Sequence, residues 1–328
     1  MPVSIGIPRT LAYYAFYPWW KTFFQEIGLE VVTSAQTSKA TLDDGVEQAV
    51  NDACIPIKIF HGHVVDLKDR VDYIFIPRLV SVRKLETETF CPKFLGLPDL
   101  VRASMEGLPK MIDVRIDMAK GRLELFRICL DLGRRFGAGF WKTARAFWKS
   151  KRAMMDYDRL IQTGLNPVEA LESWENSLHL VAEDNNKELT FAVLGYPYAV
   201  YDRFINIDLH KKLKSLGVKI ITAEMIPPRK LLREAKKMPK NLFWHFSNKV
   251  IHATSYFIKQ VKVDGIIHIT AFGCGPDAMV DKMIELTAKH EGRIPFISLT
   301  IDEHTGEGGI LTRLEAFVDM LKRQKGLA

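Results

Sequence analysis

Short apolar runs alternate along the chain with longer stretches of helical periodicity. Runs such as residues 191–194 and 265–269 have the length of buried strands, and stretches with apolar residues every three or four positions separate such runs. This order predicts parallel sheets with helices on both faces, as in Rossmann-like and flavodoxin-like domains of the α/β class. Ligands of such sheets bind beyond the carboxyl ends of the strands. No run approaches the roughly 20 residues of a membrane span, so no transmembrane helix is expected.

The two ends of the chain resemble each other. Residues 5–33 match residues 194–222 at a constant offset of 189, through a strand, a helix and a second strand without a gap. Residues 71–76 match residues 263–268 at an offset of 192. Each half reads strand, helix, strand, helix, strand, helix, strand. The sequence therefore predicts two flavodoxin-like parallel-sheet domains related by an internal repeat, facing a shared cleft.

A helical insertion is expected between the two halves. From residue 116 the sequence gives no strand signal, and apolar residues recur at helical spacing. Asn166-Pro167 has the form of a new helix start. We predict an N-terminal flavodoxin-like domain over 1–115, a helical insertion over 116–185 and a C-terminal flavodoxin-like domain over 186–328.

Composition and charge narrow the class of protein. Hydrophobic residues make up 47% of the chain and charged residues 26%, which excludes intrinsic disorder. The net charge of +7 is concentrated in residues 110–152, where twelve Lys or Arg face four acidic residues and aromatic residues are interleaved. Such a segment could dock an acidic partner, a nucleotide-bearing ligand or RNA, or it could be a solvated helix face. The N-terminus lacks a signal peptide, so we expect a cytoplasmic protein without structural disulfides.

Three of the four cysteines share a local pattern. Cys54, Cys91 and Cys274 are each followed by a proline one or two positions later, which places them before the first turn of a helix. A thiolate there accepts backbone N–H groups and meets the positive end of the helix dipole, which lowers the pKa of a thiol. Cys91 and Cys274 follow corresponding strands of the repeat, so we expect them to face each other across the cleft. Cys129 lies inside the helical insertion and is expected to be a buried apolar residue.

The three cysteines are candidate metal ligands. Soft thiolates select iron–sulfur clusters or zinc, and three of them suit a four-iron cluster with one iron left open. The local Cys-x-x-Cys spacing of ferredoxins and zinc sites is absent. The residues alone leave three interpretations open: an iron–sulfur cluster, a zinc site completed by water or His63, and three unrelated buried cysteines.

Other side chains near these cysteines are candidates for the same site. His61 and His63 could donate a proton or supply a fourth ligand, or they could pack within a helix through backbone hydrogen bonds. Lys58, four residues after Cys54, would offset the charge of a cluster or be solvated. Gly273 and Gly275 would let the backbone approach a cofactor closely.

A second group of candidates follows the last predicted strand, residues 296–300. Glu303 and His304 are possible acid and base groups at the cleft edge. The glycine-rich segment 305–310 could cradle an anion with backbone N–H groups or form a tight turn, before a helix expected to begin near Leu311.

Taken together, these motifs resemble the (R)-2-hydroxyacyl-CoA dehydratase superfamily, which includes benzoyl-CoA reductase-like proteins. The resemblance is closer to its branch of acyl-CoA dehydratase activase-related proteins. The segments that carry it are Ile5-Gly6-Ile7-Pro8-Arg9, Cys54-Ile55-Pro56-Ile57-Lys58 with His61-Gly62-His63, Phe272-Gly273-Cys274-Gly275-Pro276-Asp277, and Asp302-Glu303-His304-Thr305-Gly306-Glu307-Gly308-Gly309 with Thr312-Arg313. Dehydratase subunits of that superfamily hold a [4Fe-4S] cluster through three cysteines, which the resemblance assigns here to Cys54, Cys91 and Cys274.

The resemblance also implies an activity. An ATP-dependent activator protein would donate a low-potential electron, and the open iron would support dehydratase or reductase chemistry, with an acyl-CoA as substrate. The chain has no Gly-x-x-x-x-Gly-Lys-[Ser/Thr] loop, so it would be the electron acceptor rather than the ATPase. The alternatives are a non-catalytic electron-transfer or maturation partner of such a system, and a structural zinc protein. We expect an oxygen-sensitive protein that forms a homodimer or heterodimer and binds neither membrane nor nucleic acid.

Overall fold

The computed structural model describes residues 2–82, 88–121, 123–178, 180, 189–292 and 294–327. The chain divides into two compact units. Unit 1 comprises Met1–Arg159 and Phe243–His245, and unit 2 comprises Leu160–Leu242 and Phe246–Ala328.

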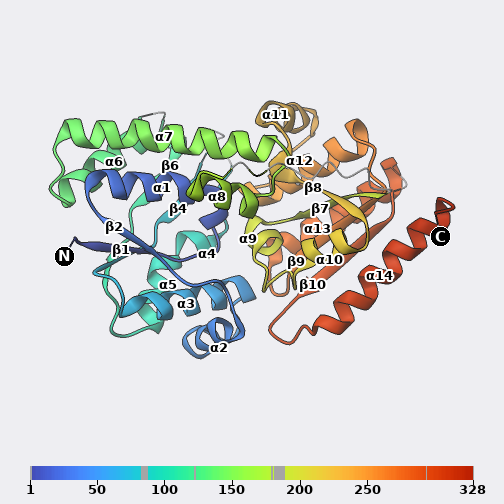
Figure 1. Cartoon of the computed structure of the whole chain (residues 1–328), viewed down its shortest axis with the longest axis horizontal. Helices are drawn as coiled ribbons and strands as arrows, with labels where there is room; N and C mark the ends of the chain where they lie inside the picture. The colour runs from blue at the N-terminus through green and yellow to red at the C-terminus, as the bar shows by residue number, and fades with distance from the viewer. Residues whose placement is uncertain are drawn as a thin grey trace. The chain divides into compact units, whose positions relative to one another are not determined.

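Unit 1 contains the first parallel sheet and most of the basic helical segment (Figure 1). Its elements are β1 (Ser4–Ile7), α1 (Tyr13–Ile27), β2 (Glu30–Thr33), α2 (Lys39–Gln48), α3 (Ile55–Lys68), β3 (Tyr73–Phe75), β4 (Arg78–Ser81), α4 (Pro92–Leu95), α5 (Leu97–Ser104), β5 (Lys110–Ile112), β6 (Arg115–Asp117), η1 (Met118–Lys120), α6 (Glu124–Arg135) and α7 (Phe140–Gln162), of which the last three residues belong to unit 2. The main sheet has the order β2-β1-β3-β5, and its three strand pairs are parallel. Helix α1 covers one face of this sheet, and α3 and α5 cover the other (Figure 1).

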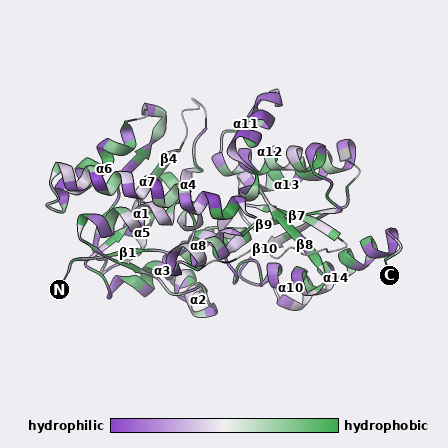
Figure 2. Ribbon diagram, turned by 45° about the horizontal axis from the view of Figure 1, so that its top comes forward, coloured by the Kyte–Doolittle hydropathy of each residue, from purple (hydrophilic) through white to green (hydrophobic). Residues whose placement is uncertain are grey.

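Unit 2 contains the second parallel sheet. Its elements are α8 (Pro167–Asn176), β7 (Leu189–Gly195), α9 (Pro197–Tyr201), α10 (Leu209–Ser215), β8 (Val218–Thr222), η2 (Ala223–Met225), α11 (Pro228–Lys237), α12 (His245–Gln260), β9 (Gly265–Ala271), α13 (Gly275–Thr287), η3 (Ala288–Gly292), β10 (Phe296–Ile301) and α14 (Glu307–Gln324). The sheet order is β10-β9-β7-β8, again with parallel pairs. Strands β7 and β9 are buried and apolar, whereas α11 is largely hydrophilic (Figure 2). In both sheets the strands therefore lie in the order second, first, third and fourth, when they are numbered along the chain. This order confirms the predicted pair of flavodoxin-like folds.

The same hydrogen bond at the start of each sheet supports the predicted repeat. Asp72 precedes β3 and accepts a hydrogen bond from the backbone N–H of Ser4 in β1 at 2.8 Å. Asp264 precedes β9 and accepts one from the N–H of Thr190 in β7 at 2.7 Å. Each carboxylate thus fixes the start of the first strand against the third strand of its sheet.

The register of the sheets corrects the alignment of the first strands. Ile5 pairs with Val31 in the first sheet, and Phe191 pairs with Ile220 in the second. Val31 and Ile220 are related by the offset of 189, but Ile5 and Phe191 differ by 186. The expectation of a match without a gap was wrong by three residues. The second half holds three more residues between these paired positions, where α9, residues 202–208 and α10 replace the single helix α1.

The helical segment also differs in part from the prediction. Strand β6 occupies its first residues and pairs in parallel with β4, so the expectation of no strand after residue 116 was wrong. A strand of three residues is too short to give a readable alternation pattern. Helix α8 begins at Pro167 as predicted, and the Asn166 side chain caps it by accepting the N–H groups of Val168 and Glu169. The predicted boundary at residue 186 lies outside the described residues.

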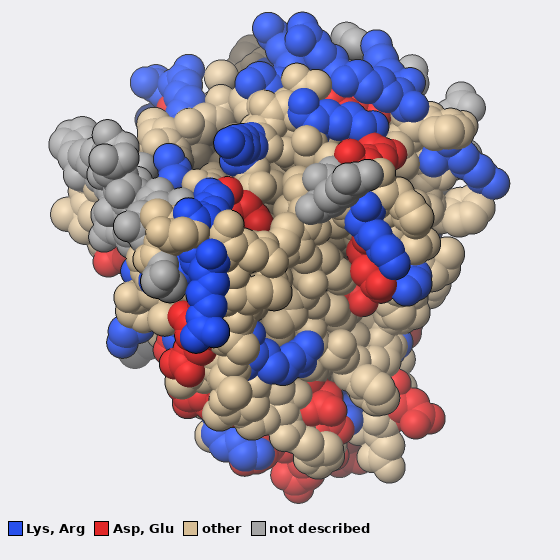
Figure 3. All heavy atoms as spheres, turned by 90° about the vertical axis from the view of Figure 1, so that its right-hand side faces the viewer, with Lys and Arg blue, Asp and Glu red and all other residues tan. Residues whose placement is uncertain are grey.

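Basic residues are not confined to the segment singled out in the sequence. Helix α11 carries five Lys or Arg and one Glu. Lys and Arg side chains gather along the upper edge of the face shown in Figure 3. In the described parts of the chain, no helix is both long enough and apolar enough to cross a membrane.

Candidate functional site

The three candidate cysteines occupy the same structural position. Cys54, Cys91 and Cys274 are the N-cap residues of α3, α4 and α13, and each of these helices has a proline in its first two positions. Gly273, before Cys274, has a φ of 75°, a backbone conformation that favours glycine. The helix starts predicted from the Cys-Pro patterns are therefore confirmed.

Cys91 shows how such a position treats its thiol. The backbone N–H groups of Lys93 and Phe94 donate hydrogen bonds to the sulfur. Burial nevertheless outweighs these hydrogen bonds, and the nearby Cys54 adds to its effect, so the pKa of Cys91 is raised above its usual value. The expectation that the helix start would lower the pKa was wrong for Cys91, because desolvation is the larger effect.

The structure places Cys54 and Cys91 together in unit 1, within electrostatic range of each other. Cys274 belongs to unit 2. Among the described residues, no three His, Cys, Asp or Glu side chains are grouped so that they could hold a metal ion. Cys129 is fully buried, and burial raises its pKa to about 12. This placement agrees with the apolar role expected of Cys129.

A buried His–Glu pair lies beside Cys91. The Nδ1 of His245 is 2.6 Å from Oε1 of Glu88, and the imidazole also packs against the ring of Phe90. The segment Phe243–His245 reaches this place by pairing with Thr89, which donates its N–H to the Phe243 carbonyl and accepts the His245 N–H, both at 2.8 Å. The sequence gives no sign of this pair, because residues 157 positions apart carry no signal of contact in a single sequence.

A buried histidine with two carboxylate partners lies between β9 and α13, the two elements that flank Cys274. His268 in β9 is fully buried, with Nδ1 2.7 Å from Asp281 and Nε2 3.3 Å from Asp277. Burial alone would lower the pKa of His268, but the charges and hydrogen bonds of Asp277 and Asp281 raise it to about 9. The imidazole is therefore positively charged at neutral pH. Asp277 is part of the motif quoted for the resemblance, but its partner in the preceding strand was not recognised.

The candidates that follow Cys54 all lie inside α3. Nδ1 of His61 donates to the Ile57 carbonyl at 2.8 Å, and Nε2 of His63 lies 3.0 Å from the Thr37 hydroxyl. Burial lowers the pKa of His61 and lowers that of His63 to about 4, so His63 is uncharged at neutral pH. Lys58 is only 5% exposed, so the alternative of a solvated lysine was wrong.

The candidates after β10 lie in a short turn. Asp302 accepts hydrogen bonds from the His304 N–H at 2.9 Å and the Thr305 hydroxyl at 2.7 Å. Glu303 is partly exposed and His304 is exposed. They follow the strand next to β9, which leads to Cys274, so they lie at the same edge of the sheet.

The helix after this turn begins earlier than predicted. Helix α14 starts at Glu307 rather than near Leu311, so two of the glycines lie in its first turn. None of the three glycines of this segment, Gly306, Gly308 and Gly309, has a positive φ. The interpretation of the segment as a tight turn that requires glycine was therefore wrong. Glu307 forms an ion pair with Lys212 at 2.8 Å.

Two family models cover most of the chain. Residues 217–321, which include β9, Cys274 and α13, match the model described as "2-hydroxyglutaryl-CoA dehydratase, D-component". The class of protein is therefore the superfamily of 2-hydroxyacyl-CoA dehydratases and activase-related proteins, as the sequence motifs predicted. Residues 4–226, more than half of the chain, match the model described as "CoA enzyme activase uncharacterised domain (DUF2229)". The chain belongs to this family, and the two matches indicate a dehydratase component or activase-related protein of CoA-enzyme chemistry.

Two other comparisons add little. No curated protein matches the chain. A solved structure described as "Nitrogenase Cp1 at pH 5" is similar at 12% sequence identity and a TM-score of 0.23. The match covers 97% of this chain and 56% of the nitrogenase chain, so the chain spans little more than half the length of that protein.

Proposed function

We propose that the protein holds a [4Fe-4S] cluster through Cys54, Cys91 and Cys274 and receives low-potential electrons from an ATP-dependent activator. The supporting observation is the pair of neighbouring thiols at the starts of α3 and α4. Cys274, the N-cap of α13 in unit 2, would be the third ligand. One iron would remain open to a substrate of the acyl-CoA class.

The donor set fits this cofactor. Thiolates are the ligands that iron–sulfur clusters require, and the N–H groups of Lys93 and Phe94 are directed at the sulfur of Cys91. The thiol of Cys91, with its raised pKa, stays protonated until a metal displaces the proton, so loading should release a proton there. The positive ends of the helix dipoles and the buried Lys58 would offset the negative charge of the loaded site.

The cluster, when bound, would supply one-electron chemistry at its open iron. The chain would hold the ligands in place and exclude water. Glu88 and His245 fix the segment before Cys91, and the His268 pair with Asp277 fixes the first turn of α13 after Cys274. His61, His63, Glu303 and His304 are the proposed proton carriers. Gly275 leaves backbone space next to Cys274, since a Cβ there would meet nothing within 4 Å, and Gly273 supplies the positive φ of the turn before Cys274.

Anaerobic purification followed by iron, acid-labile sulfide and zinc analysis tests the proposal. We expect about four iron and four sulfide per chain with a broad visible absorption. The Cys54→Ala, Cys91→Ala and Cys274→Ala variants should each lose the cluster. Cys129→Ala is the matched control, because it removes a buried thiol outside the site. Zinc in place of iron, or a cluster retained in Cys274→Ala, would overturn the assignment.

A non-catalytic electron-transfer role is the second candidate. It is favoured by the exposed basic and aromatic face of α7, which is suited to a protein partner. Addition of acyl-CoA to the loaded protein separates the two candidates. A change in the visible or paramagnetic resonance spectrum indicates an enzyme, whereas no change with any acyl-CoA indicates electron transfer alone.

A further inference from the structure

Helix α7 carries large apolar side chains on its exposed side as well as on its buried side. Its buried side consists of Thr143, Ala146, Ser150, Ala153, Tyr157 and Ile161. On the opposite side Trp141, Trp148 and Met155 are 83%, 61% and 47% exposed. An amphipathic helix of a folded domain normally leaves few large apolar residues exposed, so these three exposed side chains point to a surface that is covered by another molecule.

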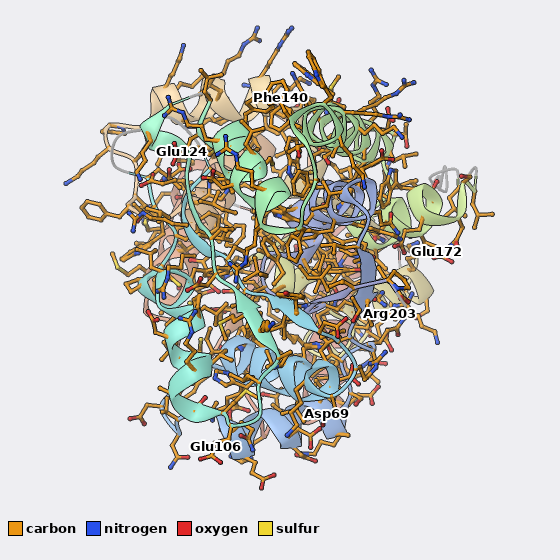
Figure 4. All side chains as sticks on the ribbon, turned by 90° about the vertical axis from the view of Figure 1, so that its left-hand side faces the viewer. Asp69, Glu106, Glu124, Phe140, Glu172 and Arg203 are labelled. Atoms are coloured by element: carbon orange, nitrogen blue, oxygen red, sulfur yellow. The ribbon has the colours of Figure 1, made fainter. Side chains whose placement is uncertain are left out.

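The exposed residues follow a regular spacing. Trp141, Trp148 and Met155 are seven residues apart and form one stripe about 21 Å long. Phe140, labelled in Figure 4 and 54% exposed, extends the apolar surface at the start of the helix. We call the stripe of Trp141, Trp148 and Met155 the α7 seam.

Arginines repeat with the same spacing beside the seam. Arg145, Arg152 and Arg159 each stand four residues after a seam residue, and their side chains are between 70% and 86% exposed. Their carboxylate partners, Glu26 and Asp156, are 3.0 to 4.0 Å away. Such exposed pairs contribute little, so the guanidinium groups can exchange them for the carboxylates of a partner at low cost.

We propose that the α7 seam is the docking site for an acidic amphipathic helix of a partner protein. Exposed apolar residues seven positions apart lie on one side of a helix, and three arginines border them on one side, so an amphipathic helix with acidic flanks can pack along this stripe. Tryptophan and arginine are the residues that contribute most to protein interfaces. The partner helix would place apolar residues on the seam and Glu or Asp against the three arginines.

Other occupants fit less well. An anionic membrane binds helices with a broad apolar face, whereas arginines directly border the seam on one side and Lys151 lies over the ring of Trp148 at 5.0 Å. A second copy of this chain would bring arginines against arginines. The proposal does not depend on the iron–sulfur assignment, because it rests on residues outside the cysteine site.

Fluorescence anisotropy of a labelled peptide tests the docking site. The probe has about three heptads, with Leu at the two core positions of each heptad and Glu at the flanking positions. We expect saturable binding to the full-length protein that weakens as salt screens the charges. Trp148→Ser and Arg152→Glu should each weaken binding about tenfold or more. Met320→Ser is the matched control, because Met320 is an exposed apolar residue of α14 in unit 2.

Three results would overturn the proposal. The first is equal binding of a peptide with the same leucines but Lys in place of Glu. The second is binding of the acidic peptide that the Trp148 and Arg152 variants leave unchanged while circular dichroism shows them folded. The third concerns phosphatidylserine vesicles and single-stranded RNA. If the Trp148 and Arg152 variants lose more affinity for either of these than for the acidic peptide, the α7 seam does not bind an acidic helix.

Discussion

The contact between α2 and α3 makes a sharp prediction about Gly62. A Cβ built on Gly62 would lie 1.8 Å from the carbonyl oxygen of Thr41, and one on Gly45 would lie 1.9 Å from the carbonyl oxygen of Lys58. Ordinary van der Waals contact begins at 3.4 Å. The Gly62→Ala variant must therefore separate the two helices by about 1.6 Å. The atom that the new Cβ meets, the carbonyl oxygen of Thr41, belongs to the backbone and not to a movable side chain.

The free-energy cost follows from two opposing effects. Overpacking of this kind costs about 3 kcal/mol, at the upper end of the usual range. Alanine in place of glycine inside a helix regains about 1 kcal/mol. We expect Gly62→Ala to lower the free energy of unfolding by about 2 kcal/mol. Because the proposed ligand Cys54 is the N-cap of α3, the same displacement should also reduce the iron loading that we propose.

Urea unfolding followed by circular dichroism measures this loss. Gly308→Ala is the matched control, because Gly308 lies in the first turn of α14 and a Cβ there meets nothing within 4 Å. The control should be as stable as the original protein or more stable by up to about 1 kcal/mol. Equal stability of Gly62→Ala and Gly308→Ala would show that α2 and α3 are not in the close contact described.

Three further predictions concern buried histidines. Glu88→Gln removes the carboxylate that accepts the His245 hydrogen bond and should lower the free energy of unfolding in urea by about 1 to 3 kcal/mol. Asp43→Asn is the control, because Asp43 forms an exposed pair with Lys39, and it should change the free energy of unfolding by less than about 0.5 kcal/mol. His268 has a pKa raised to about 9, so its contribution to stability is complete below about pH 6.5 and is lost as the pH rises through 9. The free energy of unfolding should therefore decline across this pH range in the original protein but not in the His268→Gln variant. His63 has a pKa lowered to about 4, so stability should fall as the pH drops from 6.5 towards 4, and His63→Gln should show a weaker fall between these values in thermal unfolding.

The sequence predicted the architecture well because its signals are local. Glycines after helices, prolines after cysteines and short apolar runs each act over a few residues, and the structure confirms the helix starts at Cys54, Cys91 and Cys274. The capping of α8 by Asn166 is another local signal that was read correctly.

The missed features depend on contacts between distant residues. The pairing of β4 with β6, the Glu88–His245 pair and the two carboxylates around His268 join segments that share no local pattern. The net pKa of Cys91 was missed for the same reason. The helix start is visible in sequence, but the depth of burial that outweighs it depends on the whole unit.

The segment Phe243–His245 limits how far the two halves of the repeat are independent. It follows α11 in the chain, yet it belongs to unit 1, where the imidazole of His245 hydrogen-bonds the buried carboxylate of Glu88. The carboxylate of Glu88 is 5% exposed, and a buried carboxylate is costly when a hydrogen-bond partner is removed, so the loss of this segment would destabilise the burial of Glu88. The chain from Glu88 to Cys91 would then lose its shape, since Thr89 is held by the same segment on both its N–H and its carbonyl. The position of Cys91 in unit 1 therefore depends on residues encoded within the second half of the repeat.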